Sequence, residues 1–262
     1  MIHAVFLTYG EQEAGWETVS SMYCALSAGR KSKSCGIRDP GAFKTSVIAG
    51  RLLEKHLTKL TGLETAALAY SDGGSGRPRL SSAGNIDFNI SHTERAVLAV
   101  FKLFGDGEAP HIPCVGCDIE RAGGRFRKPG MPESIVNRFF ADGEKKLFTA
   151  LLRQEGLPVR PCGDNPSAET VKGEKPAVPG DEELFFRFWT AKEAYGKMTG
   201  QGITKTLGRE TLLLREGVPV YSDGSVLIFR QYEDLIMTVA ADSRLKDQPV
   251  VFTRETVSGL LQ

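Results

Sequence analysis

The chain has 262 residues, of which 41% are hydrophobic and 25% are charged; these proportions exclude a collagen-like or disordered protein and predict one large domain or two smaller ones. The net charge of +1 creates no general attraction for nucleic acid, so a charged partner would have to meet a local patch. The apolar runs are far shorter than the roughly 18 residues of a membrane-spanning helix, and residues 1–12 lack the basic start of a secretory signal. We therefore expect a cytoplasmic protein with no membrane or nucleic-acid partner.

The first predicted element is a helix over residues 40–57. Asp39 can cap free backbone N–H groups, Pro40 suits the first helical position, and apolar residues follow at helical spacing. The next predicted elements are the strand Ile86–Ile90, the turn Ser91–Arg95 and the strand Ala96–Phe104.

A third strand, predicted over Ile112–Glu120, contains two of the five cysteines. Cys114 and Cys117 have the CxxC spacing of zinc and redox sites, but no second CxxC pair completes a set of four ligands. An offset of three also places two strand residues on opposite faces, and an odd number of scattered cysteines fits reduced thiols. We therefore favour two small apolar strand residues, with a zinc or redox site as the alternative.

Helices and then strands are predicted in the second part of the chain, with Asp142 as a cap and Gly200 as a stop. The predicted helices are Glu133–Phe140, Asp142–Arg153 and Asp181–Thr199, and the predicted strands are Val218–Val220, Ser225–Gln231 and Asp234–Ala241.

Two larger patterns concern the organisation of the chain. Residues 155–183 hold five of the 13 prolines and have no hydrophobic period, which predicts a surface insertion or lid within a domain. The apolar run at 96–101 is echoed at 235–240, each time after a polar turn. This echo predicts two similar α+β halves that meet near residues 110–120.

Gly116, Asp118 and Glu120 alternate along the third strand and therefore share one face. Neighbouring carboxylates repel each other, and a divalent cation that prefers oxygen ligands, such as Mg²⁺, relieves the repulsion. The glycine leaves room for a ligand to approach the backbone. The pattern predicts either a metal site or a solvated strand end.

Glu193 and Lys197 lie one turn apart on the same side of the long predicted helix. One interpretation is a surface ion pair between them. The other makes Glu193 a third metal ligand or a base, beside a lysine that neutralises a phosphate.

Ser91 and His92 are adjacent, so in a strand they face apart and cannot act as nucleophile and base. They could bind phosphate oxygens, although a histidine in a turn is often structural. No Walker or dinucleotide-binding loop is present. A basic cluster, which is either a solvated face or a grip for an anionic ligand together with Arg77, comprises Arg30, Lys31, Lys33, Arg38 and Lys44.

Four motifs occur in a diagnostic order: Phe88-Asn-Ile-Ser-His92, Gly116-x-Asp118-x-Glu120, Phe139-Phe140 with Glu144, and Trp189-x-x-Lys192-Glu193-Ala194-x-x-Lys197. The set resembles the 4′-phosphopantetheinyl transferase family, in particular its longer class that activates peptide and polyketide synthetases. The resemblance runs from about Lys31 to Ala241. It implies an α+β pseudo-dimer in one chain, each half a small antiparallel sheet packed with a long helix, with halves at 1–112 and 113–262.

The resemblance also implies coenzyme A as donor, Mg²⁺ as cofactor with Mn²⁺ as an alternative, and an apo acyl, peptidyl or aryl carrier protein as acceptor of a monomeric enzyme. The sequence departs from the family pattern at Thr93, at Cys117 and in the insertion 155–183. The resemblance implies metal ligands at Asp118, Glu120 and Glu193, catalytic roles for Glu193 and Lys197, and coenzyme A contacts from Lys31, Lys44, Arg77, Ser91, His92, Asp118 and Lys197.

Two competing functions remain. A coenzyme A- or carrier-binding protein without transfer activity would be expected to lack a site carboxylate or the helix lysine, and all are present. A Mg²⁺-dependent phosphohydrolase would instead transfer to water. A basic loop after the metal strand, either a dock for acidic carriers or simply solvated, contains Arg121, Arg125, Arg127 and Lys128.

Overall fold

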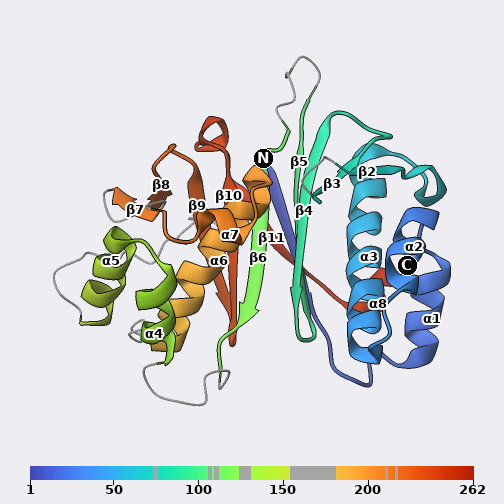
Figure 1. The fold of residues 1–262 in the computed structure, drawn as a ribbon. Coiled ribbons are helices and arrows are strands. Elements are labelled where there is room, and N and C mark those ends of the chain that lie inside the picture. Colours follow the sequence, from blue (N-terminus) through green and yellow to red (C-terminus); the bar gives the residue numbers. More distant parts are fainter. Residues whose placement is uncertain are drawn as a thin grey trace, which may run out of the picture.

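The computed structural model describes residues 1–72, 76–105, 108, 112–123, 131–153, 181–209, 212–215 and 218–262. It has the expected α+β fold, with two sheets packed face to face and helices on their outer faces (Figure 1). The elements up to residue 103 are β1 (Ile2–Thr8), α1 (Trp16–Cys24), α2 (Ala28–Cys35), α3 (Pro40–Thr61), a 3-10 turn (Thr65–Ala67), β2 (Tyr70–Asp72), β3 (Pro78–Leu80), β4 (Ile86–Thr93) and β5 (Ala96–Leu103).

The later elements begin with the carboxylate-bearing strand and end with a short helix. They are β6 (Val115–Arg121), α4 (Met131–Phe139), α5 (Asp142–Leu152), α6 (Asp181–Thr199), α7 (Ile203–Thr206), β7 (Leu212–Arg215), β8 (Val218–Tyr221), β9 (Val226–Tyr232), β10 (Leu235–Ala241), a 3-10 turn (Ser243–Leu245), β11 (Val250–Glu255) and α8 (Val257–Leu260).

The connectivity of the elements is repeated. One sheet has the order β11-β1-β5-β4 and the other β6-β10-β9-β8-β7. Along the chain, a first strand (β1 or β6) is in both cases followed by helices, by a pair of short strands, and by a hairpin whose second strand returns to pair antiparallel with the first. The short pair β2–β3 forms a sheet of its own, whereas β7 and β8 extend the second sheet. This repeat supports the pseudo-dimer, which we keep as a proposal.

The helix α3 has the predicted start and a longer course. The Asp39 side chain accepts a hydrogen bond from the Ala42 N–H at 2.7 Å, and the helix ends at Gly62, whose φ of 73° is unfavourable for other residues. Its apolar face, including Leu52 and Leu53, packs against Phe88 and the β4–β5 hairpin. Burial of this face holds α3 on its sheet.

The two sheets share an apolar layer between them. Ile2, Ala4 and Phe6 alternate along β1 and enter this layer, where they meet residues such as Ile119 and Met237 of the second sheet. Sheets that pack face to face in this way exclude water from both inner faces. The inner ends of β4 and β6 are thereby held beside each other.

Several predicted boundaries change. β4 continues to Thr93, so Ser91 and His92 lie in a strand and only Glu94 and Arg95 form the turn. The predicted turn was wrong because polar side chains at a strand edge were taken for turn residues. The cap of α5 is also different from the prediction. The N-cap residue is Ala141 and not Asp142, and the Ala141 N–H donates to the Glu144 carboxylate.

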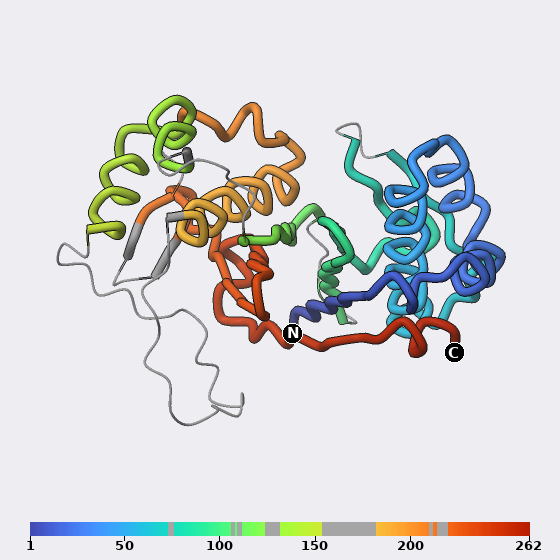
Figure 2. Tube along the Cα trace, turned by 90° about the horizontal axis from the view of Figure 1, so that it is seen from below, coloured from blue at the N-terminus to red at the C-terminus, as the bar shows by residue number. Residues whose placement is uncertain are grey.

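Five strands were not predicted, namely β1, β2, β3, β7 and β11, and the last of them joins distant parts of the chain. β11 pairs in parallel with β1, and α8 then lies against α3, where Lys55 donates to the Gly259 carbonyl at 2.7 Å and Arg51 to Leu260 at 3.0 Å. Figure 2 shows the C-terminal segment running back to the N-terminal helices. The division at residue 112 stays a prediction, with residues 250–260 packed on the N-terminal elements.

The two cysteines of the CxxC pair are buried. Cys114 and Cys117 both lie in the layer between the sheets, so the expectation of opposite faces was wrong, because Cys114 precedes the first residue of β6. Burial raises the pKa of the Cys117 thiol to about 12.

Of the predicted insertion 155–183, only residues 181–183, in α6, belong to the described part. In that part, no helix is both long and apolar enough to span a bilayer.

Candidate active site between β4, β6 and α6

Side chains of β4 take the place of a backbone ladder where this edge strand meets β6. The Asp87 carboxylate accepts from the N–H groups of Cys114 at 2.7 Å and Val115 at 3.0 Å, and the Asn89 side-chain oxygen accepts from the N–H of Cys117 at 3.1 Å. These buried bonds satisfy backbone donors at the sheet edge. They also fix the register in which the two strands face each other.

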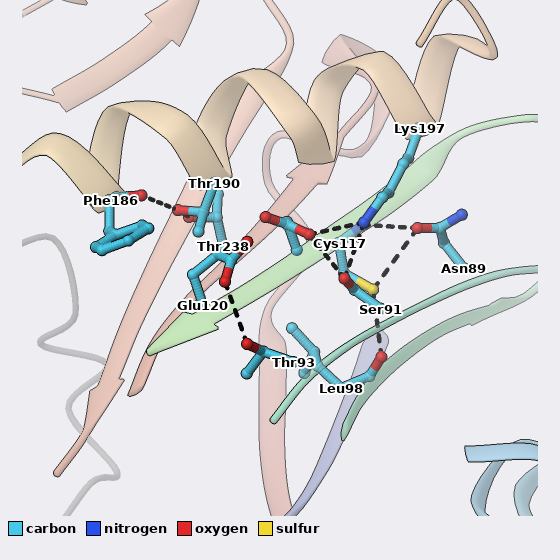
Figure 3. Close-up of polar contacts among 11 residues, drawn as sticks. Asn89, Ser91, Thr93, Leu98, Cys117, Glu120, Phe186, Thr190, Lys197 and Thr238 are labelled. Carbon is cyan, nitrogen blue, oxygen red and sulfur yellow. Dashed lines mark hydrogen bonds and ion pairs between the residues drawn. The ribbon is translucent and has the colours of Figure 1, made fainter. Parts of the chain in front are cut away.

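The same register brings two hydroxyls to the predicted metal-site carboxylates. Ser91 Oγ donates to Asp118 Oδ1 at 2.7 Å, and Thr93 Oγ1 donates to a Glu120 oxygen at 3.2 Å. Figure 3 shows Thr93 and Glu120 facing each other across the two strands. The site is therefore built from both halves of the chain.

Gly116 allows α6 to lie directly on β6. A Cβ atom at this position would collide with the Ala194 carbonyl and would lie 2.6 Å from the Met198 amide nitrogen. No other residue type fits without moving the helix. The face shared by Gly116, Asp118 and Glu120 thus turns toward α6, as period two requires.

Lys197, near the end of α6, completes a three-residue cluster. Its Nζ atom lies 2.7 Å from Asp118 Oδ1. The same atom lies 2.8 Å from Ser91 Oγ (Figure 3). Burial works against the ammonium, but the charge of Asp118 and its hydrogen bond outweigh burial and raise the pKa of Lys197. The lysine is therefore charged at physiological pH.

The second oxygen of Asp118 is unusual. Asp118 Oδ2 is buried and has no hydrogen-bond partner among the described residues. A buried carboxylate oxygen without a partner is costly unless a ligand supplies one. This atom therefore marks a place for a cation or a donor from a bound ligand.

Glu193 lies one turn before Lys197 and is half-buried. Burial, together with the negative charges of Asp118 and Glu120, raises the pKa of Glu193, although Lys197 opposes the shift. Three carboxylates consequently influence one another, as the sequence led us to expect. An oxygen-only donor set of this kind suits a hard divalent cation.

The carboxylates do not form a preassembled metal cage. Among the described residues, no group of three or more histidine, cysteine, aspartate or glutamate side chains is arranged to hold a metal ion. Lys197 instead supplies the positive charge at Asp118. The chemistry of the donors fits a cation, and Asp118 Oδ2 is the atom best placed to receive it.

Positive charge also collects around His92. The ring is solvent-exposed, and partial desolvation together with the charges of Lys197, Lys33 and Arg30 lowers the pKa of His92. Arg30 is buried and its Nε–H has no hydrogen-bond partner in the described structure. A group of cations with an unused donor forms a favourable place for an anion.

Two lysines predicted to bind coenzyme A have other contacts. Lys31 donates to the Cys24 carbonyl at 2.8 Å, on a different side of α2 from Arg30, and the Lys44 ammonium lies 4.8 Å from the centre of the Trp16 ring. The sequence pattern identified the basic cluster but did not single out Arg30 and Lys33, the members whose charges lower the pKa of His92. Helical spacing could have found them, because Arg30 and Lys33 are three residues apart and share a face.

Arg77 does not face the cluster as an unpaired cation. It is 6% exposed, and its two terminal nitrogens donate to four oxygens of the protein, one of them an Asp87 carboxylate oxygen 2.8 Å away. Its buried Nε–H has no hydrogen-bond partner in the described structure, so this is the one donor left for a phosphate unless the other bonds are replaced. The structure thus brings Ser91, Asp118 and Lys197 into contact with one another, whereas the terminal nitrogens of Arg77 bind the end of α6 and the strand β4.

A second buried ion pair, not predicted as part of the site, holds α6 from its other side. Lys192 Nζ lies 2.6 and 2.7 Å from the two carboxylate oxygens of Glu144, and both side chains are fully buried. Glu144 also accepts from the N–H groups of Ala141 and Leu212. The pair joins α5, α6 and β7 behind the face that carries Glu193.

The chain is similar to known proteins. Residues 114–217 match the profile of the 4′-phosphopantetheinyl transferase superfamily. The chain is 26% identical to the 4′-phosphopantetheinyl transferase HetI of Nostoc sp., over 60% of this chain and 52% of that protein. It is 23% identical to a 4′-phosphopantetheinyl transferase of Bacillus subtilis, over 74% of this chain and 69% of the relative. It is 26% identical to the 4′-phosphopantetheinyl transferase psf-1 of Bacillus pumilus, over 64% of this chain and 56% of that protein. The match to HetI thus spans about half of that relative's length.

Proposed function

Because the chain belongs to the 4′-phosphopantetheinyl transferase superfamily, we propose that it transfers the 4′-phosphopantetheine arm of coenzyme A to a serine of an apo carrier protein and releases 3′,5′-ADP. The observation that carries the proposal is the cluster of Asp118, Lys197 and Ser91, with Glu193 one turn away on α6. This cluster combines a carboxylate, a cation and a candidate base at the place where two strands and a helix meet.

A divalent cation is part of the proposal. Asp118 and Glu120, with Glu193 as a further ligand, would hold Mg²⁺, and Mn²⁺ would suit the same oxygen donors. The unpartnered Asp118 Oδ2 supports this assignment. When bound, such an ion neutralises the negative charge of a pyrophosphate and so favours attack on phosphorus.

The protein's own groups account for the proton and the leaving group. Glu193 accepts the proton of the carrier serine, and its raised pKa makes the carboxylate a stronger base than an ordinary glutamate. The serine oxygen forms a bond to the phosphorus that carries pantetheine, and the bond from this phosphorus to the bridging oxygen breaks. Lys197 holds its ammonium where negative charge grows on the departing 3′,5′-ADP. The acceptor hydroxyl belongs to the carrier, so Ser91 is a binding residue in this scheme.

We assign the 3′-phosphate of coenzyme A to the basic region around His92. Arg30 and Lys33 support this assignment, because their charges reach His92 and the Arg30 Nε–H has no partner in the described structure. Lys31 and Lys44 remain candidates from the sequence, and both would have to leave their present contacts. A phosphate dianion would gain charge-assisted hydrogen bonds from this group.

Carrier docking, the monomeric state and a cytoplasmic location remain predictions. In the basic loop that could dock an acidic carrier, Arg125, Arg127 and Lys128 lie outside the described residues. Arg121 donates to both carboxylate oxygens of Asp234, at 2.5 and 2.7 Å, so it already has an acidic partner. Carrier docking that uses this loop should weaken as salt is added.

The test is intact-mass spectrometry of several apo carrier proteins incubated with the protein, coenzyme A and Mg²⁺. Transfer adds about 340 Da to the carrier serine as a phosphodiester, and the gain should disappear with EDTA and with Asp118→Asn. Binding of coenzyme A without any mass gain would favour the non-catalytic binding protein. Free phosphopantetheine formed without a carrier would favour the phosphohydrolase.

A further inference from the structure

Arg77 occupies a buried position between the end of α6 and the strand β4. Its Nη1 donates to the carbonyls of Lys197 at 2.9 Å and Met198 at 3.0 Å. Its Nη2 donates to Asp87 Oδ1 and to the Phe88 carbonyl, both at 2.8 Å. The side chain is 4% exposed, so these contacts are shielded from water.

The two sets of contacts belong to the two parts of the site. The carbonyls come from the last turn of α6, whose Lys197 side chain reaches Asp118. Asp87 and Phe88 come from β4, the strand that carries Ser91. The other oxygen of Asp87 accepts from the first N–H groups of β6. One guanidinium thus connects the three elements that supply the cluster.

We propose that Arg77 is a positioning residue that sets the place of Lys197 relative to Asp118 and Ser91. This inference rests on the proposed transfer function for its kinetic part. The carbonyl that Arg77 binds belongs to the same residue whose ammonium enters the site. A shift of the last helical turn would therefore move the Lys197 side chain directly.

The geometry requires arginine in particular. A planar guanidinium can donate from two nitrogens to two elements at once, whereas a lysine ammonium is a single point with flexible reach. A cation at the carboxyl end of a helix also stabilises the free carbonyls there. Arg77→Lys keeps the charge but is expected to lose the bridge between α6 and β4.

The experiment compares Arg77→Lys with Arg79→Lys, a matched change two residues later in β3, where the residue is half-buried. In Arg77→Lys, kcat is expected to fall roughly ten- to a hundredfold, the scale of a displaced active-site group, while the Kd for coenzyme A from calorimetry stays within about twofold. Arg79→Lys should leave both unchanged. An unchanged kcat, or a loss confined to coenzyme A affinity, would overturn the positioning role.

A double-mutant cycle distinguishes positioning from general damage. If Arg77 acts through Lys197, Arg77→Lys should cost little further kcat in a Lys197→Met background, because coupled residues are non-additive. Independent, multiplying losses would contradict the inference. Asp87→Asn supplies a second variant, since it weakens the same bridge while Arg77 itself is not substituted. This variant should also have a lower kcat.

An activity-independent readout keeps this inference separate from the proposed function. Lysine acylation followed by peptide mass spectrometry measures how freely the Lys197 amine is released from Asp118. Arg77→Lys should raise the labelling rate of Lys197 about threefold or more, the effect of losing roughly 0.7 kcal/mol of protection, and Arg79→Lys should not. Unchanged labelling would refute the positioning role even if transfer is found, and increased labelling would support it even if no carrier is modified.

Discussion

The strands β1 and β6 each begin one copy of the repeated connectivity, yet the faces that they turn to their long helices have opposite chemistry. On β1, Val5 and Leu7 are buried in the apolar core against α3. On β6, Asp118 and Glu120 face α6 and carry the site. The register is equivalent: Val5 and Leu7 pair with Ala99 and Val97 of β5, and Asp118 and Glu120 pair with Thr238 and Ile236 of β10.

The comparison shows how one architecture separates stability from chemistry. The face of β1 buries apolar side chains, and their transfer from water stabilises the fold. The same place on β6 holds mutually repelling carboxylates and a buried oxygen without a partner in the described part of the chain, features that destabilise the fold unless a ligand compensates. Such local cost is typical of sites where function is retained at the expense of stability.

The largest expected effect is at the acidic face. Asp118→Asn removes the negative charge that holds Lys197 and would receive a cation, so turnover should fall by about a thousandfold or more, beyond the loss from one transition-state donor. The thermal midpoint should fall as well, because Lys197 loses its carboxylate partner, but the variant should still fold because no core volume changes. The control Asp234→Asn removes a carboxylate in the turn of the same sheet. Turnover retained in Asp118→Asn would remove this residue from the site.

The corresponding change on the apolar face should have the converse result. Leu7→Ala leaves a cavity at a fully buried position and is expected to lower the free energy of unfolding by about 2–5 kcal/mol. Turnover per folded molecule should not change. Urea unfolding measures the first quantity, and Leu213→Ala, at an exposed leucine, is the matched control. A loss of turnover in folded Leu7→Ala would show that the two faces are not separate in function.

Glu193→Gln tests the base. Turnover is expected to fall about a hundredfold or more, with coenzyme A affinity unchanged; the reverse pattern would make Glu193 a binding residue. Because only the ionised carboxylate accepts a proton, wild-type kcat should rise with pH through the raised pKa of Glu193, and this acid limb should be absent from the variant. Glu183→Gln, on the same helix in an ion pair with Arg187, is the control.

The same substitution predicts a change in stability whose sign follows from the pKa. A carboxyl with a raised pKa in the folded state holds its proton more tightly there than in the unfolded chain. Above that pKa the ionised group destabilises the fold, and below the unfolded value the effect vanishes. Glu193→Gln should therefore raise the thermal midpoint at pH 8 but not at pH 4. A lower midpoint at pH 8 would contradict this assignment.

The smallest expected effects concern the basic region. His92 has a lowered pKa and is neutral at pH 7, so acidification adds a charge that should favour coenzyme A over dephospho-coenzyme A. The gain should be about two- to fivefold, as for one partly exposed ion pair. Calorimetry with both ligands measures it, and comparison with His92→Ala removes the contribution of the phosphate's own titration. Lys33→Ala should weaken this preference for coenzyme A more than Lys31→Ala does. The opposite order would assign the 3′-phosphate contact to Lys31.

Local patterns predicted much of the fold. The helices α3 and α6 were found because a capping residue or an abrupt glycine stop bounds a helical apolar pattern. β1 was missed because consecutive residues are buried on both of its faces, so no alternation is visible. β11 was missed because its stability comes from pairing with the opposite end of the chain.

The sequence by itself determined which groups could share a face. The alternation of Asp118 with Glu120 and the one-turn spacing of Glu193 and Lys197 follow from backbone periods that need no tertiary contact. Only the tertiary structure decided where Arg77 points, because its partners on α6 lie 120 and 121 residues away. Contacts at such separations depend on how the halves pack, and no local period records them.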